Sequence, residues 1–441
     1  MNDQIDMRYK RRWYAVIMCT IAFFFSYMDR QVLSLLIEPI QADLGISDTQ
    51  FGLLQGFSFT LCFAVMGLPI ASAADRHPRP LIIAAGVIVW SMATVACGFA
   101  RGFGQLFLAR MMIGAGEASL SPATYSMISD MFDRSGIGRA TAVYSLGSFL
   151  GAGFAYLVGG AAIAALETIG PVSMLGTVLK PWQLVFVILG LPGILLGIVI
   201  YLTIAEPRRI ESGRTSPAGA RETGVTAYLS AHRDVFVPHI LGFSFYAMLL
   251  FGLLAWSPAL LMRVYGFAPQ EAGYWLGTIA VVMCGGGVLV SGWLLDGGVR
   301  RFGRPGPFRL GAIAALGTLP ALVMLYLAQE PWQALAALAV AMFFASFPMP
   351  LSAFAIQTIV PSWLRARVSA VFLFFNSMIG LSLGAAMIGL LNDRLFTGAQ
   401  GVQSSLPLVA GVAGLIAAML LASGARPFSN RLSGSAPGDN L

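Results

Sequence analysis

Charged residues are scarce in this sequence. Asp, Glu, Lys and Arg make up 11% of the 441 residues, whereas 57% are hydrophobic and the mean hydropathy is +0.77. About a quarter of the residues of a soluble domain are charged, so this composition excludes an ordinary soluble enzyme. It also excludes an intrinsically disordered chain. A membrane protein remains, and the 50 glycines suit one because small residues let membrane helices approach closely.

Residues that carry catalytic chemistry are also few. The four cysteines lie in apolar segments and lack the spacing of a disulfide framework or a zinc site. The three histidines, His77, His232 and His239, lie at or beyond the ends of the expected helices. The sequence has no glycine-rich nucleotide loop, no dinucleotide fingerprint and no His-Glu-x-x-His motif. We therefore expect a protein that is not an enzyme and that binds no metal or organic cofactor.

Long apolar runs fill most of the chain. A membrane-spanning helix needs about 20 apolar residues, and twelve stretches qualify, near 13–40, 49–74, 80–100, 104–131, 138–166, 181–204, 236–263, 269–295, 307–328, 331–360, 367–392 and 402–424. The polar stretch EPRRIESGRTSPAGARETG has the composition of a flexible linker. We predict an all-α membrane protein with an N-terminal six-helix bundle, a cytoplasmic linker, a C-terminal six-helix bundle and a cytoplasmic tail, at residues 1–204, 205–235, 236–424 and 425–441.

The basic residues predict the orientation of these helices. With the N-terminus inside, 21 of the 27 Lys and Arg residues fall on cytoplasmic segments, which is the bias typical of membrane proteins. The formal net charge of +7 is therefore explained by topology and does not indicate a nucleic-acid partner. We expect a multi-pass protein of the bacterial inner membrane, with both termini in the cytoplasm.

An internal repeat supports the division into halves. The segment LGISDTQFGLLQG (44–56) aligns with YGFAPQEAGYWLG (265–277), and three glycines coincide. Pro122 and Arg139 are 17 residues apart, as are Pro350 and Arg367. Parallel repetition of a six-helix unit is the arrangement of the major facilitator transporters. The chain resembles that superfamily, which implies two bundles related by a pseudo-twofold axis and transport by alternating access.

The loop ASAADRHPRP (71–80) is similar to a cytoplasmic signature of the same superfamily, although Ala71 and Pro78 replace its two usual glycines. SGWLLDGGVRR (291–301) repeats the pattern in the second half. The resemblance implies a conformational latch in which the Asp of the first loop contacts the start of the helix near 367–392 when the cytoplasmic side is closed. Its candidate residues are Asp75, Arg76, Arg79, Asp296 and Arg300. Alternatively, these are topology charges and turn residues.

Four ionisable residues lie inside the predicted helices of the first half: Asp29, Arg30, Arg110 and Glu117. Each costs about 2.5–3.5 kcal/mol on insertion scales, so such groups usually face a cavity or a partner. At 1.5 Å per residue, Asp29 and Glu117 lie about 16 and 18 Å from the outer ends of their helices, which is a similar depth. Arg110 and Glu117 share a helical face, whereas Asp29 and Arg30 point about 100° apart. The alternative role is an ion-paired cluster that only holds the helices together.

These residues carry a closer resemblance. FSYMDRQVLSLLIEPIQADLGISDTQFGLL (25–54) and ARMMIGAGEASLSPATYSMISDMF (109–132) resemble the spinster branch of the superfamily, which includes lysophospholipid and sphingosine-1-phosphate exporters. The resemblance implies a proton-responsive carboxylate at Glu117, a headgroup or ion-pair role for Arg110, and a coupling pair at Asp29 and Arg30. Organic-anion and hexuronate symporters also carry Gly-x-Gly-Glu on this helix, so they provide the alternative substrate class.

The second half has no charge in the middle of its helices. Its candidate cavity residues are apolar, aromatic or amide side chains: Phe245, Tyr246, Trp256, Phe347, Phe374, Phe375 and Asn376. Charges on one half and apolar groups on the other suit an amphiphile, with its headgroup at Arg30, Arg110 and Glu117 and its chain at Phe245, Tyr246, Phe374 and Asn376. The alternative is that these aromatic residues pack against another helix or lipid, which is the more common role on a membrane helix.

The sequence therefore predicts a proton-coupled secondary transporter of an amphiphilic lysolipid or sphingoid substrate, with protons as the coupling ion at Glu117 and Asp29. The alternative is a proton-coupled carrier of small organic anions or drugs. A lipid enzyme inside the membrane would need a catalytic His, Ser or paired Asp, which is not evident. A channel would not need the twofold repeat with a central charge cluster. We expect a monomer without a protein partner.

Overall fold

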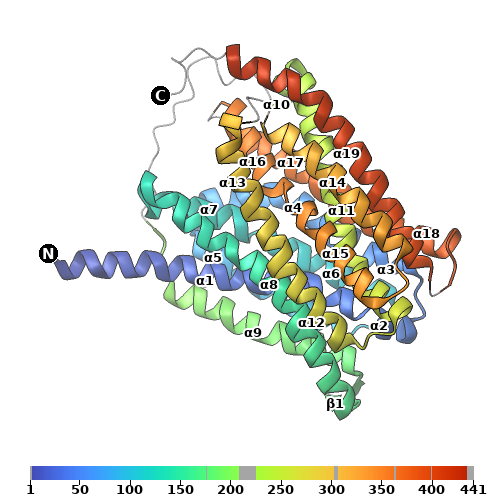
Figure 1. Ribbon diagram of the computed structural model, residues 1–441. Helices are drawn as coiled ribbons and strands as arrows, with labels where there is room; N and C mark the ends of the chain where they lie inside the picture. The colour runs from blue at the N-terminus through green and yellow to red at the C-terminus, as the bar shows by residue number, and fades with distance from the viewer. Residues whose placement is uncertain are drawn as a thin grey trace. The chain divides into compact units, whose positions relative to one another are not determined.

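The computed structural model describes residues 2–434 except 175, 208–224, 302–305, 362–363 and 399 (Figure 1). Those residues form two compact units, Met1–Glu211 with Leu261–Val281, and Ser212–Leu260 with Val282–Leu441. Most of the predicted linker 205–235 and the end of the predicted tail 425–441 lie outside the described residues. The predicted boundaries between bundles, linker and tail therefore stay predictions.

The first unit is built from helices joined by short connections. Its helices are α1 (Asn2–Leu35), α2 (Ile37–Leu44), α3 (Asp48–Gln55), α4 (Phe57–Arg76), α5 (Arg79–Cys97), α6 (Phe103–Glu117), α7 (Leu120–Met131), α8 (Arg134–Ile169), α9 (Pro181–Thr203) and α12 (Pro269–Ile279). A hairpin of two short antiparallel strands, β1 (Val172–Met174) and β2 (Thr177–Leu179), joins α8 to α9. The sequence did not predict this hairpin.

Helices of the first unit pack closely where glycines meet a neighbouring backbone. Helix α1 lies along α8, α5 along α9, and α6 against α4 and α5. A Cβ atom at Gly147 or Gly151 of α8 would collide with the carbonyl oxygen of Thr20 or Phe24 on α1. This close approach gives dispersion contact between helices in a solvent that supplies no hydrophobic force.

The second unit holds the remaining helices. They are α10 (Val225–Ala231), α11 (Arg233–Tyr265, of which the last five residues belong to the first unit), α13 (Gly285–Arg301), α14 (Gly306–Leu327), α15 (Pro331–Ala345), α16 (Pro348–Ile359), α17 (Arg365–Phe375), α18 (Gly384–Arg394) and α19 (Gly401–Gly434). Wider π-helical turns, η1 (Ala280–Cys284) and η2 (Asn376–Leu383), precede α13 and α18. Helix α14 packs against α15 and α19.

Eleven helical segments of the described chain are long and apolar enough to cross a membrane. The predicted span 104–131 is not among these segments; it is broken after Glu117 into α6 and α7, of 15 and 12 residues. The span 331–360 is broken at the same place of the repeat, between Ala345 and Pro348, which is 228 residues later. The pair α6–α7 thus makes the twelfth segment, and the break repeats in both halves.

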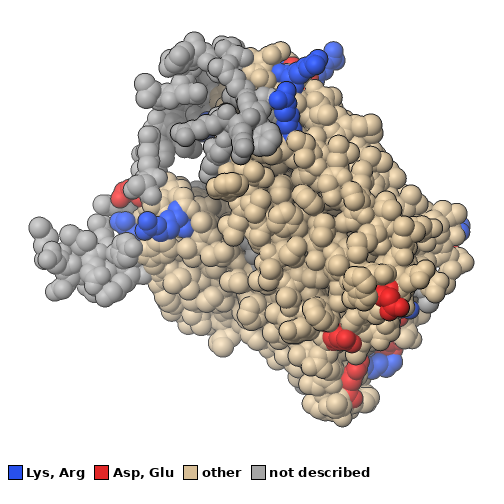
Figure 2. Space-filling model, viewed as in Figure 1, with Lys and Arg blue, Asp and Glu red and all other residues tan. Residues whose placement is uncertain are grey.

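The surface is apolar over a broad area. In Figure 2, few of the coloured surface side chains are Lys, Arg, Asp or Glu, and most are uncharged. Large hydrophobic side chains are exposed on several helices, among them Leu202, Leu289, Trp293 and Met419. A soluble protein rarely exposes contiguous apolar surface of this extent. The chain is a multi-pass membrane protein.

Candidate functional site

The centre of the first unit holds an ion pair between Arg30 of α1 and Glu117, the last residue of α6. The Arg30 Nε atom donates a hydrogen bond of 2.8 Å to Glu117 Oε2, and Arg30 Nη2 donates to the same oxygen. Ser26 Oγ, one turn before Arg30, donates to this oxygen too, at 2.6 Å. The Glu117 side chain is fully buried, whereas that of Arg30 is 18% exposed. Arg30 is therefore the member of the pair that another molecule can reach.

Aromatic rings surround the guanidinium of Arg30. Its central carbon lies 4.3 Å from the ring centre of Phe59, 4.9 Å from that of Tyr27 and 5.6 Å from that of Phe63. Cation–π attraction at this range contributes about 0.5–2 kcal/mol. Ring faces attract a cation but do not neutralise it. Among the described residues, the only anionic partner of Arg30 is therefore Glu117.

Asp29 and Arg110 are deeply buried beside this pair but do not join it. Asp29 turns toward α5, where Thr94 Oγ1 lies 3.0 Å from Asp29 Oδ2. Arg110 Nη1 donates to the backbone carbonyl of Asp29 at 3.2 Å. Within the described part of the chain, Asp29 Oδ1, Arg110 Nε and Glu117 Oε1 are buried without a hydrogen-bond partner. The two carboxylate oxygens can each receive a proton or a hydrogen bond, and Arg110 Nε can donate to a polar ligand.

The structure brings together all four charged residues that the sequence singled out, but only Arg30 and Glu117 form an ion pair with each other. Glu117 pairs with Arg30 on another helix, and the structure shows no contact between Glu117 and Arg110, its neighbour two turns away on α6. Sequence reasoning missed Ser26, Thr94 and Gln55, whose Nε2 donates to the Arg30 carbonyl at 3.3 Å. The four-residue spacing of Ser26 and Arg30 could have indicated the first. No sequence signal marks the other two, because each lies on a different helix.

The candidate residues of the second unit differ in how accessible they are. Tyr246 and Trp256 are fully buried, and each donates a hydrogen bond to a backbone carbonyl. Phe374 is exposed, whereas Phe245 and Asn376 are half-buried. Asn376 begins the π-helical turn η2, a feature often found at functional sites. Tyr246 and Trp256 thus pack inside the unit in this structure, whereas the side chains of Phe245, Phe374 and Asn376 are accessible to a ligand or lipid.

The latch residues are described only in part. Arg79 is buried and binds Asp130 Oδ2 at 2.6 Å, Glu206 Oε1 at 2.8 Å and Ser126 Oγ at 2.9 Å, so it joins the start of α5 to α7 and to the segment after α9. Arg76 is exposed. The side chains of Asp75, Asp296 and Arg300 lie outside the described residues. The latch between Asp75 and the later helix therefore stays a prediction.

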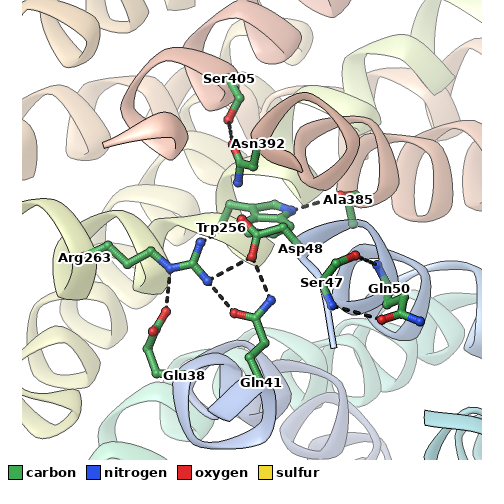
Figure 3. A network of polar contacts seen from close by, with 10 residues as sticks. All are labelled: Glu38, Gln41, Ser47, Asp48, Gln50, Trp256, Arg263, Ala385, Asn392 and Ser405. Carbon is green, nitrogen blue, oxygen red and sulfur yellow. Dashed lines mark hydrogen bonds and ion pairs between the residues drawn. The ribbon is translucent and has the colours of Figure 1, made fainter. Parts of the chain in front are cut away.

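The first unit contains a second polar cluster (Figure 3). Its central residue is Arg263, in the last turn of α11. Its guanidinium donates to Glu38 Oε1 at 2.6 Å, to Gln41 Oε1 at 2.5 Å and to both oxygens of Asp48 at 2.7 and 3.0 Å. One arginine thus fastens the end of α11 to α2 and α3.

Comparisons with known proteins agree with this architecture. The family model of the Major Facilitator Superfamily matches residues 19–385. An MFS-type efflux pump of Mycolicibacterium smegmatis is 30% identical over 425 residues, which cover 95% of this chain and 94% of the pump. The hexuronate transporter of Bacillus subtilis is 26% identical over 264 residues, 58% of each protein.

Among solved structures, a bacterial homologue of the human lysosomal transporter spinster superposes with a TM-score of 0.77. It is 27% identical, with 96% of this chain and 97% of that chain covered. The predicted fold and the resemblance to spinster proteins are thereby confirmed, and relatives of this kind are transporters and not enzymes. The chain belongs to the Major Facilitator Superfamily of membrane transporters.

Proposed function

We propose that this transporter couples protons to the movement of a small amphiphile with an anionic headgroup, and that the Arg30–Glu117 ion pair performs the coupling. The observation that carries the proposal is that this pair joins α1, which is long and apolar enough to cross a membrane, to α6, with Glu117 fully buried and Arg30 partly exposed. An incoming anion can compete with Glu117 for Arg30. Glu117 would then be left without its cation in a low-dielectric site, where the neutral acid is favoured over the carboxylate.

The position of Glu117 on its helix supports this exchange. It is the last residue of α6, and the C-terminal end of a helix carries partial negative charge that disfavours an anion. Arg30 supplies the main compensation. Substrate binding at Arg30 and proton binding at Glu117 would therefore favour each other, and by linkage the effect is reciprocal. Asp29, buried beside the pair with one oxygen unpartnered, is a second candidate for carrying a proton.

The amphiphilic substrate is supported by two observations. The chain is similar over nearly its whole length to a bacterial spinster homologue, and its second unit offers Phe245, Phe374 and Asn376 without any charged side chain in the middle of its described helices. Small organic anions or drugs are the alternative. The similarity to an efflux pump and to a hexuronate transporter favours that alternative, and a short anion would use the same arginine.

The test uses sealed vesicles that contain the purified protein and a labelled lysophospholipid, with and without an imposed pH gradient. Wild type should move the lipid along the gradient, and Glu117→Gln should move it without gradient dependence. Glu167→Gln, a charge removal at an exposed site near the end of α8, is the matched control and should behave as wild type. Absence of movement by folded wild-type protein would refute the lipid substrate. Equal competition by hexuronate would favour the small-anion alternative.

A further inference from the structure

Glu117 is held through one of its two carboxylate oxygens. Oε2 accepts hydrogen bonds from Ser26 Oγ, Arg30 Nε and Arg30 Nη2, whereas Oε1 is buried without a partner among the described residues. Both donors lie on α1, one helical turn apart. The carboxylate is therefore oriented by α1, and its open oxygen is the one that can receive a proton without breaking an existing contact.

The hydrogen of the Ser26 hydroxyl is committed to Glu117. Ser26 is 1% exposed, and its oxygen lies 3.4 Å from Arg30 Nη2, which can only donate. The hydroxyl therefore accepts from Arg30 and donates to Glu117 Oε2 at 2.6 Å. A donor stabilises a carboxylate more than it stabilises the neutral acid, because hydrogen bonds to charged groups are stronger.

We propose that Ser26 is a positioning residue that holds Glu117 by Oε2, directs the proton to Oε1, and lowers the pH at which Glu117 becomes protonated. The inference deepens the proposed function and rests on it for its meaning in transport. Ser26 adds a neutral donor that stays in place when a substrate takes Arg30. The carboxylate would thus keep a defined orientation throughout the exchange of partners.

Other titratable and charged groups surround the pair, and a test must leave them unchanged. Arg30 contacts Glu117 directly, and the Tyr27 ring on α1 contacts Arg30. Asp29 on α1, Arg110 on α6 and Tyr144 on α8 act on the pair over longer range, and Cys97 on α5 acts on Asp29 and Arg110. The ring faces of Phe59 and Phe63 on α4 carry no titratable group. Replacing Ser26 alone removes one donor and no charge, so a change in proton binding reports on that donor.

Ser26→Ala is the test variant, and Ser34→Ala is its matched control. Ser34 lies two turns further along α1 and is equally buried, but its hydroxyl donates only to the Gln31 carbonyl of its own helix. We expect the midpoint of the pH profile of lysophospholipid transport to move to higher pH by about one unit in Ser26→Ala, the size expected for one hydrogen bond to a charged group. Ser34→Ala should keep the wild-type profile.

A second measurement does not depend on transport. Infrared titration of the purified protein follows the C=O stretch of protonated carboxyl groups, and the band lost in Glu117→Gln identifies Glu117. This band should appear at higher pH in Ser26→Ala than in wild type. Coincident titrations of the two proteins, or an equal shift in Ser34→Ala, would overturn the role of Ser26. Wild-type transport that ignores pH would instead refute proton coupling, and the infrared titration would still decide on Ser26.

Discussion

Removing Arg30 should cost the protein about 3 kcal/mol of unfolding free energy, and removing Glu117 as well should restore most of it. In Arg30→Met, the fully buried Glu117 side chain loses its only ionic partner. Breaking one side of a buried pair costs about 3–5 kcal/mol. The lower end applies here because Ser26 still donates to the carboxylate. The loss should shrink at acidic pH, where Glu117 can be protonated.

The assay is a double-mutant cycle of Arg30→Met and Glu117→Gln, measured by SDS-induced unfolding in mixed micelles. We expect a coupling free energy of about 2–3 kcal/mol. The exposed pair of Arg431 and Asp234, whose side chains are 33% and 47% exposed, is the control and should couple by less than about 1 kcal/mol. Additivity of the Arg30 and Glu117 variants within about 0.5 kcal/mol would refute the reasoning, because the two side chains would then not depend on each other.

Two further predictions concern helix packing and the polar cluster around Arg263. Gly114→Ala should destabilise the protein by about 1–3 kcal/mol, because its Cβ would collide with the backbone carbonyl of Phe59 on α4. The control Gly104→Ala places its Cβ in open space and should be neutral or slightly stabilising. Equal melting temperatures of the two variants would contradict this packing. Arg263→Gln should lower the free energy of unfolding by about 1–3 kcal/mol, because the carboxylates of Glu38 and Asp48 lose their cation. The control is Arg101→Gln, at an exposed site without an ion pair among the described residues. It should change the free energy of unfolding by less than about 0.5 kcal/mol. Similar losses in the two arginine variants would show that the cluster is not a stabilising one.

The two halves share a backbone plan but not their chemistry. With the 228-residue offset that aligns the breaks after α6 and α15, the position of Glu117 is occupied by Ala345 in the second half. With the 221-residue offset of the first repeat, Arg30 corresponds to Phe251. The repeat therefore supplies the helices and their breaks twice, whereas the ion pair is present once.

The sequence alone singled out the four charged residues that the structure brings together. Charged side chains are so costly in a membrane that four of them, Asp29, Arg30, Arg110 and Glu117, stand out in apolar helices without any structure. Helical rise also placed the two carboxylates at similar depth. Apolar length and the internal repeat predicted the family of folds, because a membrane admits few ways of satisfying backbone hydrogen bonds.

The partners of these residues were decided only by the tertiary structure. Spacing along α6 places Arg110 and Glu117 on one face, yet Glu117 pairs with Arg30 on α1. The rotation of α1 about its axis turns Arg30 and Ser26 toward α6 and turns Asp29 toward Thr94 on α5. Periodicity determines the face and depth of a side chain but not the neighbour that the face meets. The same limit hid the role of Arg263, whose partners on α2 and α3 are more than 200 residues away in sequence. Contacts between helices depend on the packing of the whole chain, and that is information that no local pattern contains.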